Sequence, residues 1–287
     1  MLTLNSPQTV QETAQKWKKE SNQIALVPTM GCLHEGHLQL VQMAKKYAEK
    51  VVVSIFVNPL QFGPNEDFEK YPRAFEQDSA KLAELGVDLL FYPSVKDLYP
   101  DGFCTKIKVG ALSERLCGQF RPGHFDGVAT VCLKLFEVTQ ADFAVFGQKD
   151  FQQLKVIERM ARDFNLPVTI LPHPTVRASD SLALSSRNTY LSDEERQWAQ
   201  KIPAVLKNAR QLISENPFIT VSELKSRLIA SISTVPLKLQ YLEVTKTKDL
   251  EPTSGEEKVV TLPHPHLFIA AFAGSTRLID NITLNGG

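Results

Sequence analysis

The apolar run 51–57, Val-Val-Val-Ser-Ile-Phe-Val, limits the possible folds of this chain more than any other segment. A strand with one solvent-exposed face alternates apolar and polar residues. This run scarcely alternates, which is typical of a strand covered on both faces. A second apolar segment precedes it at 24–28, a helical pattern lies between them at 37–49, and a third apolar segment follows at 87–92. Short strands that alternate with helices indicate a parallel sheet with crossover helices, and we expect 51–57 near its centre.

The pattern predicts two domains. The parallel-sheet domain continues through a strand at 142–146, a helix at 151–164 and a strand at 168–171. Residues 172–188 are polar and rich in Pro and Ser, which indicates a functional loop and domain junction. The remainder predicts a small α+β domain, with helices at 193–213 and 221–232 and strands at 239–244, 259–262, 267–273 and 279–284. We therefore expect an α/β domain over 1–175 and a smaller α+β domain over 176–287.

Composition argues against several partners. Lys plus Arg and Asp plus Glu number 32 each, so no net charge draws the chain to nucleic acid or to an acidic membrane surface. The longest apolar runs are too short to cross a bilayer. Four cysteines without CxxC spacing argue against zinc and against a disulfide framework, and reduced thiols indicate the cytoplasm. The first residues show no export signal, which fits this expectation.

The segment 27–37, Val-Pro-Thr-Met-Gly-Cys-Leu-His-Glu-Gly-His, is the most informative motif. It reads as a strand end, a tight loop and a helix start, where backbone N–H groups can bind an anion. His34 and His37 are three residues apart and share one side of the first helical turn. Gly31 and Gly36 remove side chains where a nucleotide approaches. A Walker P-loop, a GxGxxG motif and the HExxH zinc spacing are all missing, and a bare HxGH is equally compatible with an ordinary surface helix start.

Two further segments support a nucleotide site. Residues 146–150, Phe-Gly-Gln-Lys-Asp, repeat the strand-end geometry, with Lys149 placed to neutralise phosphate and Asp150 to bond ribose hydroxyls or to cap the next helix. Residues 176–188 supply hydroxyl and guanidinium groups that could close over a triphosphate, and the alternative interpretation is a polar linker. Asp78 is a possible supporting carboxylate or a solvated helix residue, and His124 is interpreted as structural.

At this point the chain resembles one family, the pantothenate synthetases or pantoate–β-alanine ligases, nearly from end to end. The resemblance rests on the ordered motifs 28–37, Phe-Val-Asn-Pro-Leu-Gln-Phe-Gly at 56–63, Tyr-Pro-Arg at 71–73, Tyr-Pro-Asp-Gly at 99–102, Arg-Pro-Gly-His-Phe-Asp-Gly-Val-Ala-Thr-Val at 121–131, Phe-Gly-Gln-Lys-Asp-Phe-Gln-Gln at 146–153 and Leu-Ser-Ser-Arg-Asn at 184–188. HxGH alone indicates only the wider nucleotidyltransferase superfamily. The motifs at 56–63 and 121–131 narrow the resemblance to this family.

The resemblance implies a Rossmann-like domain that binds ATP and pantoate, a C-terminal lid domain, a cytoplasmic homodimer and dependence on Mg²⁺, whose protein ligands stay unknown. The implied reaction joins (R)-pantoate to β-alanine and releases AMP and pyrophosphate. Gln61 and Gln153 correspond to pantoate contacts, Asn58 and Gln61 to β-alanine contacts, and His37 to the proton donor. The implied ATP contacts are Met30, Gly31, Cys32, Leu33, His34, Glu35, Gly36, His37, Gly147, Gln148, Lys149, Asp150, Val176, Leu184, Ser185, Ser186 and Arg187. Cys32 is a departure, because the family often has Ala there.

The chemistry assigns roles to part of this set. Activating a carboxylate with ATP builds negative charge on phosphate oxygens, so the groups required are fixed cations and N–H donors, and no serine or cysteine nucleophile is needed. His34, His37, Lys149 and Arg187 suit that task. Two rivals stay open, an adenylyltransferase of the same superfamily and a noncatalytic nucleotide sensor. Retention of Lys149, Gln61 and both histidines argues against the sensor.

Overall fold

The computed structural model describes residues 1–64, 66–246 and 249–284. Contacts between Cα atoms divide the chain into two compact units. The first unit holds residues 1–148 and 153–174, and the second holds 149–152 and 175–287. The short segment 149–152 therefore belongs with the second unit, although both of its neighbours in sequence belong to the first. Within the described ranges, no helix combines the length and the apolar character that crossing a membrane requires.

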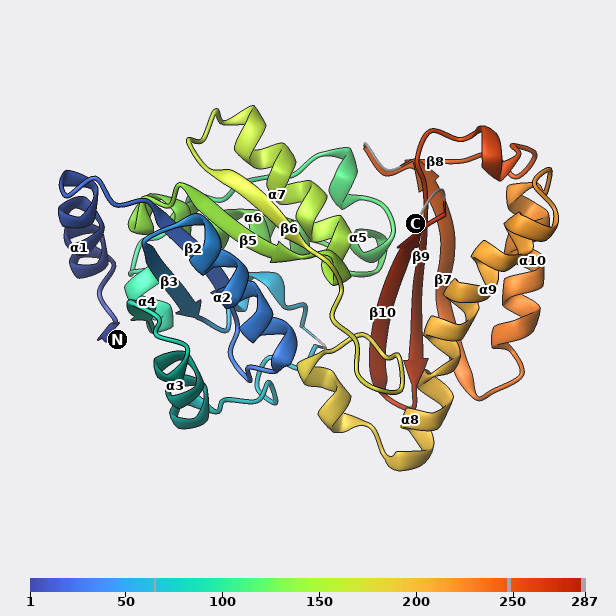
Figure 1. The fold of residues 1–287 in the computed structure, drawn as a ribbon, viewed down its shortest axis with the longest axis horizontal. Helices are drawn as coiled ribbons and strands as arrows, with labels where there is room; N and C mark the ends of the chain where they lie inside the picture. Colours follow the sequence, from blue (N-terminus) through green and yellow to red (C-terminus); the bar gives the residue numbers. More distant parts are fainter. Residues whose placement is uncertain (65, 247–248, 285–287) are drawn as a thin grey trace. The chain divides into compact units, whose positions relative to one another are not determined.

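The first unit is a layered α/β structure (Figure 1). Residues 1–174, of which 149–152 belong with the second unit, contain β1 (Leu2–Leu4), α1 (Pro7–Lys19), β2 (Ile24–Thr29), α2 (Glu35–Tyr47), β3 (Lys50–Ile55), η1 (Pro59–Gln61), α3 (Phe75–Glu84), β4 (Leu89–Phe91), α4 (Val95–Leu98), η2 (Ala111–Ser113), α5 (Cys117–Phe120), α6 (His124–Thr139), β5 (Phe143–Gly147), η3 (Gln148–Asp150), α7 (Phe151–Asp163) and β6 (Thr169–His173). In this series, η denotes a short 3₁₀ helix.

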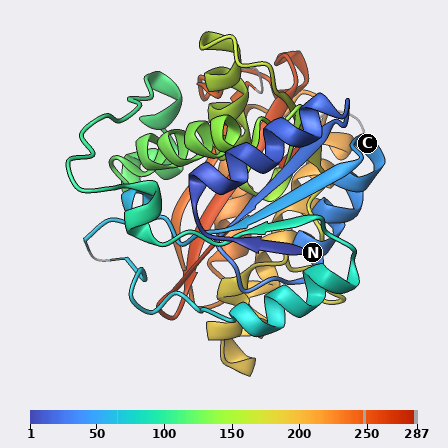
Figure 2. The ribbon, with the colours of Figure 1, turned by 90° about the vertical axis from the view of Figure 1, so that its left-hand side faces the viewer.

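The sheet of the first unit is parallel, and its order is β1-β4-β3-β2-β5-β6. Helices α2 and α3 pack on one face through a core that includes Val51 and Val53. On the other side, α6 packs on β2 and lies beside α1 (Figure 2). Residues 51–55 are all buried, which confirms the prediction of an inner strand covered on both faces. Strand order reverses between β2 and β5, and the carboxyl ends of strands at such a switch point are where open sheets bind ligands.

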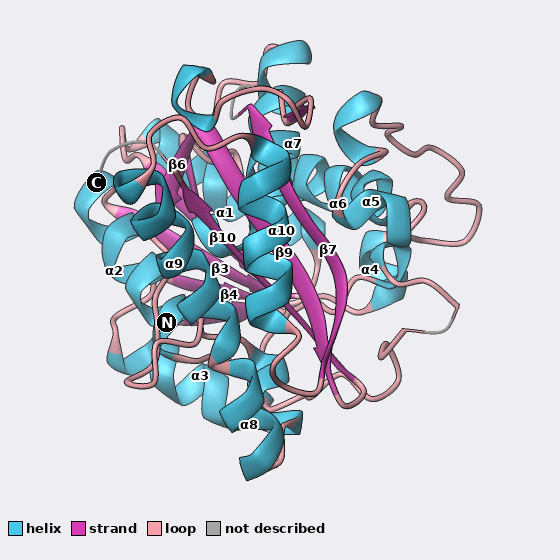
Figure 3. Ribbon diagram, turned by 90° about the vertical axis from the view of Figure 1, so that its right-hand side faces the viewer, coloured by secondary structure: helices cyan, strands magenta, loops and turns pink. Residues whose placement is uncertain are grey.

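The second unit is a small α+β structure, as predicted. It contains η4 (Ser186–Tyr190), α8 (Asp193–Ala199), α9 (Lys201–Glu215), α10 (Val221–Ile232), β7 (Leu237–Lys246), β8 (Glu251–Pro252), η5 (Val259–Thr261), β9 (Pro265–Ala273) and β10 (Thr276–Thr283). The sheet is antiparallel in the order β10-β9-β7-β8. Figure 3 shows α9 and α10 lying over this sheet, and their apolar faces form its core.

Two predicted elements are wrong. The single helix predicted over 193–213 is divided at Gln200 into α8 and α9. Pro203 explains the division, because it has no N–H to donate to the carbonyl of Ala199 in a continuous helix. The strand predicted over 259–262 is instead the 3₁₀ turn η5. Val259 and Leu262 are buried while the residues between them are exposed, a spacing of three that suits a 3₁₀ turn and not a strand.

Candidate active site

The loop between β2 and α2 has a left-handed backbone at two consecutive residues. The φ angle is 84° at Gly31 and 51° at Cys32. A Cβ on residue 31 would lie 3.0 Å from Cγ2 of Ile55 and 3.2 Å from Oδ2 of Asp78. Position 31 therefore needs glycine for its backbone conformation and for space.

A buried carboxylate on α3 holds this loop in place. Asp78 is 1% exposed, and its two oxygens accept the backbone N–H groups of Cys32 at 2.7 Å and Leu33 at 2.8 Å. One helical turn later, Lys81 Nζ donates to the carbonyl of Leu33 at 2.7 Å. The interpretation of Asp78 as a solvated helix residue is therefore wrong. Because the N–H groups of Cys32 and Leu33 donate to this carboxylate, they are not available to bind a phosphate.

The environment of Cys32 keeps its side chain unreactive. Burial raises the pKa of the Cys32 thiol, and the charge of Asp78 adds to this effect, while Lys81 acts in the opposite direction. The thiol is therefore protonated near neutral pH, and a protonated thiol is a weak nucleophile.

His34 and His37 form a stacked pair at the start of α2. His34 is the N-cap residue and His37 is the third residue of the first turn, and their ring centroids are 4.0 Å apart. The backbone N–H of His34 donates to Nδ1 of His37 at 3.3 Å. Because a ring nitrogen that accepts carries no proton, the proton of the neutral His37 ring is on Nε2. His37 is thus oriented as an N–H donor.

A buried amide network supports Gln61. The Asn58 side chain is 1% exposed. Its Nδ2 donates to Gln61 Oε1 at 3.1 Å and to the carbonyl of Gly127 at 3.0 Å, and its Oδ1 accepts from the N–H of Leu60 at 3.2 Å and from the hydroxyl of Tyr99 at 2.9 Å. Burial raises the pKa of Tyr99, so its phenol stays a donor. Direct contact between the Asn58 side chain and β-alanine would replace one of these bonds, and that contact stays a prediction.

Gln61 itself keeps hydrogen-bonding capacity. Its side chain is buried, with 9% exposed. Nε2 donates to the sulfur of Met30 at 3.1 Å, which links Gln61 to the loop between β2 and α2. With one bond to each end of the amide, one N–H and one oxygen lone pair remain for a substrate.

Two polar side chains, Arg121 and His124, bond the backbone carbonyl of Gln61, and Glu66 holds Arg121 in turn. Arg121 forms two 2.6 Å bonds to the carboxylate of Glu66 and donates to the carbonyl of Gln61 at 3.2 Å. His124 Nδ1 donates to the same carbonyl at 2.8 Å, and its Nε2 lies 3.0 Å from Arg121 Nη1. Since guanidinium only donates, that Nε2 accepts and the ring is neutral. Burial opposes ionisation of Glu66, but the bonds and charge of Arg121 outweigh it and lower the pKa of this carboxyl.

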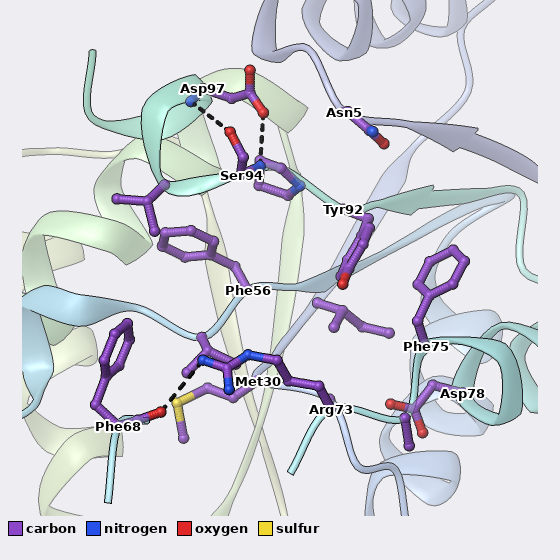
Figure 4. A pocket seen from close by; sticks show the side chains of 16 residues that line it. Asn5, Met30, Phe56, Phe68, Arg73, Phe75, Asp78, Tyr92, Ser94 and Asp97 are labelled. Carbon is purple, nitrogen blue, oxygen red and sulfur yellow. Dashed lines mark hydrogen bonds between the residues drawn. The ribbon is translucent and has the colours of Figure 1, made fainter. Parts of the chain in front are cut away.

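A pocket of about 280 Å³ opens beside the loop at the carboxyl ends of β1 to β4 (Figure 4). Met30, Gly31 and Asp78 form its side nearest the loop. Four aromatic side chains line part of the rest, and the polar residues include Asn5 and Arg73. The aromatic lining residues are Phe56, Phe68, Phe75 and Tyr92.

The second unit carries the other segments predicted to bind ATP. Lys149 lies in η3 directly after β5, with its side chain 20% exposed and its ammonium 3.7 Å from Asp150 Oδ2. Residues 176–184 fold into a hairpin, with Arg177 paired to Ala183 and the N–H of Leu184 bonded to the carbonyl of Val176 at 2.9 Å. This hairpin replaces the polar loop that composition predicts.

Comparison with known proteins decides the family. A family model described as pantoate-beta-alanine ligase matches residues 2–283. The chain belongs to the pantoate–β-alanine ligase family. This confirms the resemblance drawn from the ordered motifs, and with it the activity of a ligase that joins pantoate to β-alanine.

Members of the pantoate–β-alanine ligase family match over nearly full length. A pantothenate synthetase of Sulfurihydrogenibium sp. is 47% identical over 98% of this chain and 99% of its own length. The crystal structure of pantothenate synthetase from Thermus thermophilus has a TM-score of 0.92 and 41% identity, and covers 100% of each chain. The Francisella tularensis ligase, complexed with β,γ ATP and β-alanine, has a TM-score of 0.81 and 35% identity over 100% of this chain and 99% of its own. The predicted fold class is confirmed.

The motifs of the pantoate–β-alanine ligase family identified part of the supporting structure in advance. Tyr99, Arg121 and His124 lie in segments that carried the resemblance, so a signal for them was present in the sequence. His124 is structural, as interpreted, but it is buried and bonded to Gln61. The sequence named Asp78 as a possible supporting carboxylate, but nothing local decided between that role and a solvated helix residue, because its partners lie 45 and 46 residues away.

The carboxylate of Asp78 gives a first prediction. Asp78→Ala leaves two N–H groups without their acceptor, at a cost of about 1–3 kcal/mol for each that stays buried. We expect a lower thermal unfolding midpoint and reduced pantothenate formation, with a smaller effect for Asp78→Asn, which keeps an acceptor oxygen. Glu76→Gln, an exposed change on the same helix, is the matched control. An Asp78→Ala protein that melts and turns over like the parent would contradict the role of this carboxylate.

Glu66 gives a second prediction, on pH. Its folded-state pKa lies below the ordinary value of 4.5, so the ionised carboxylate stabilises the fold above that value, and this stabilisation is lost as pH falls through the folded pKa. The difference in unfolding temperature between the parent and Glu66→Gln should therefore be largest near neutral pH and should shrink below pH 4.5. For Glu69→Gln, an exposed change nearby, the difference in unfolding temperature from the parent should not depend on pH in this way. A difference for Glu66→Gln that is constant with pH would rule out the ion pair as its source.

Proposed function

We propose that this chain makes pantothenate in two steps, with ATP as the activating substrate. Pantoate would first attack the α-phosphorus of ATP and expel pyrophosphate, and the amine of β-alanine would then displace AMP from the pantoyl adenylate. A carboxylate does not condense with an amine in water, because its oxygen is a poor leaving group, and adenylation solves this problem. The Francisella tularensis relative crystallised with an ATP analogue and β-alanine supports ATP and β-alanine as ligands here.

The observation that carries this proposal is the oriented histidine pair at the end of β2, in a chain whose whole length matches the family. Both chemical steps develop negative charge on phosphate oxygens. The Nε2–H of His37 is fixed by the bond at Nδ1 before any ligand arrives, and such preorganised donors are the groups that stabilise developing charge. His37 would donate to a phosphate oxygen and serve as the proton donor, with His34 beside it.

The remaining ATP contacts are assigned to three segments. Residues 30–37 would bind the nucleotide from the loop, Gly147, Gln148, Lys149 and Asp150 from the end of β5, and Val176 with 184–187 from the hairpin of the second unit. Lys149 and Arg187 would supply positive charge. Among the described residues, the only partner of the Lys149 ammonium is Asp150 at 3.7 Å, so its charge is weakly engaged. The lid role of residues 176–287 stays a prediction.

Gln61 and Gln153 are assigned to pantoate, a small hydroxy acid that neutral amides can bind through its hydroxyl and carboxylate oxygens. Gln61 fits that task, because its amide keeps one N–H and one oxygen lone pair unused. Asn58 and Met30 orient this amide, and Arg121 holds the backbone carbonyl of the same residue. Gln61 and Asn58 are also assigned to β-alanine, and for Asn58 we infer an additional role in orienting Gln61.

Mg²⁺ would enter with ATP. The described residues contain no group of three His, Cys, Asp or Glu side chains that could hold a metal ion. The protein residues therefore do not fit a preformed metal site, and Mg²⁺ is assigned to the phosphates of ATP, which suits an ion that keeps most of its water. A cytoplasmic homodimer with small-molecule substrates completes the proposal, supported by family membership.

The test is purified protein with ATP, Mg²⁺, pantoate and β-alanine, followed for pantothenate. Pantoate-dependent ATP–pyrophosphate exchange should occur alone, and AMP release should follow only when β-alanine is added. His37→Ala should lower kcat by roughly 10²–10³ with an unchanged unfolding midpoint, because one charge-stabilising donor is lost. Gln42→Ala, exposed on the same helix, is the control. Retention of AMP in the product would indicate an adenylyltransferase, and near-normal turnover by His37→Ala would reject the assigned role.

A further inference from the structure

Two consecutive residues of β10, Asp280 and Asn281, bond to two segments assigned to ATP that lie far apart in sequence. We propose that both are positioning residues for ATP, holding the hairpin 176–184 and the Lys149 segment. This inference rests on the proposed function, because it assumes that these two segments bind ATP. It adds residues that none of the ordered motifs contains.

Asp280 holds the hairpin 176–184 through Arg177, which lies in the first half of the hairpin. The Asp280 side chain is 3% exposed, and its oxygens accept from Arg177 Nη1 at 2.7 Å and Nη2 at 3.0 Å. The same Nη1 also donates to the carbonyl of Ser181 at 3.1 Å, on the turn of the hairpin. A fork of this kind fixes direction as well as distance. Arg177 follows Val176 directly, so the pair sets the position of a residue assigned to ATP.

Asn281 anchors the Lys149 segment. Its Nδ2 donates to the carbonyl of Lys149 at 2.9 Å, across 132 residues of sequence. Its Oδ1 accepts from His266 Nε2 at 2.8 Å, which orients the amide so that Nδ2 points to Lys149. The His266 ring stacks on Phe151 at 4.1 Å between centroids. These contacts are part of the reason that residues 149–152 group with the second unit.

The strand explains why two neighbours reach two different segments. Consecutive residues of a strand point to opposite faces, so Asp280 and Asn281 serve opposite sides of β10. Every residue of β10 is in register with β9, from Thr276 opposite Ala273 to Thr283 opposite His266. Because β10 is fully paired, its backbone is rigid. It therefore fixes the hairpin and the Lys149 carbonyl relative to each other within the second unit.

The experiment compares Asn281→Leu, which keeps the volume but has no N–H, and Asp280→Asn, which keeps the shape but lacks the charge. Steady-state assays would give KM for ATP, pantoate and β-alanine, with thermal unfolding as the folding check. For each variant we expect KM for ATP to rise roughly tenfold, because one buried hydrogen bond to a segment assigned to ATP is lost or weakened. The KM values for pantoate and β-alanine should stay unchanged. Arg210→Ala is the matched control, because Arg210 Nε bonds the carbonyl of Thr283 in the same strand but touches neither segment.

A double variant separates positioning from general stability. If Asn281 acts through Lys149, adding Asn281→Leu to Lys149→Ala should raise KM for ATP no further. The proposal is overturned if folded variants keep the parent KM for ATP, if all three KM values rise together, if the two effects multiply, or if Asn281→Leu, Asn281→Ser and Asp280→Asn all fail to fold. A Lys149→Ala enzyme with full activity would instead reject the proposed ATP site.

Discussion

The carboxylate of Asp78 is the interaction on which the rest of the candidate site depends. Gly31 and Cys32 both have left-handed backbone, a conformation that a residue with a side chain adopts at a cost. Two N–H bonds to a buried carboxylate offset that cost and fix where α2 begins. The start of α2 then fixes the N-cap and third positions, which bring the rings of His34 and His37 into contact. The orientation of the histidines is therefore a consequence of a residue on a different helix.

Gln61, like the histidine pair, is oriented by polar residues, most of which come from other segments of the chain. Gln61 is oriented by Asn58, Asn58 is held by Tyr99, and the backbone of Gln61 is held by Arg121 and His124. Each supporting group is buried or partly buried, where an unmatched polar atom is costly, so the network favours one arrangement. In the second unit, Asp280 and Asn281 play the corresponding part for the hairpin and for Lys149. Groups assigned to substrates are thus oriented by neighbouring polar residues, most of which are not themselves assigned to a substrate.

The sequence predicted the elements whose signal is local. The run 51–57 has the composition of an inner strand, and its residues 51–55 lie in one, β3. Residues 30–37, 56–63 and 146–153 were found because their side chains form recognisable motifs. Where a distant or single residue decides the outcome, local patterns failed, as for Pro203, which divides a helix by lacking one N–H, and for the turn at Val259. The sequence left two interpretations of Asp78 open and gave no signal for Asn281, because their partners are 45 to 132 residues away.

One physical reason explains why local sequence patterns did not assign the roles of Asp78 and Asn281. Asp78 bonds the N–H groups of Cys32 and Leu33, and Asn281 bonds the carbonyl of Lys149. Backbone groups are the same in every residue, so the segment that is held shows no trace of its support. The departure at Cys32 is explained in the same way. Because the carboxylate binds the backbone of that residue, a different small side chain leaves the support intact, and burial with the charge of Asp78 keeps the pKa of the Cys32 thiol raised and the thiol protonated. The loop can therefore vary at this position while the orientation of His37 is preserved.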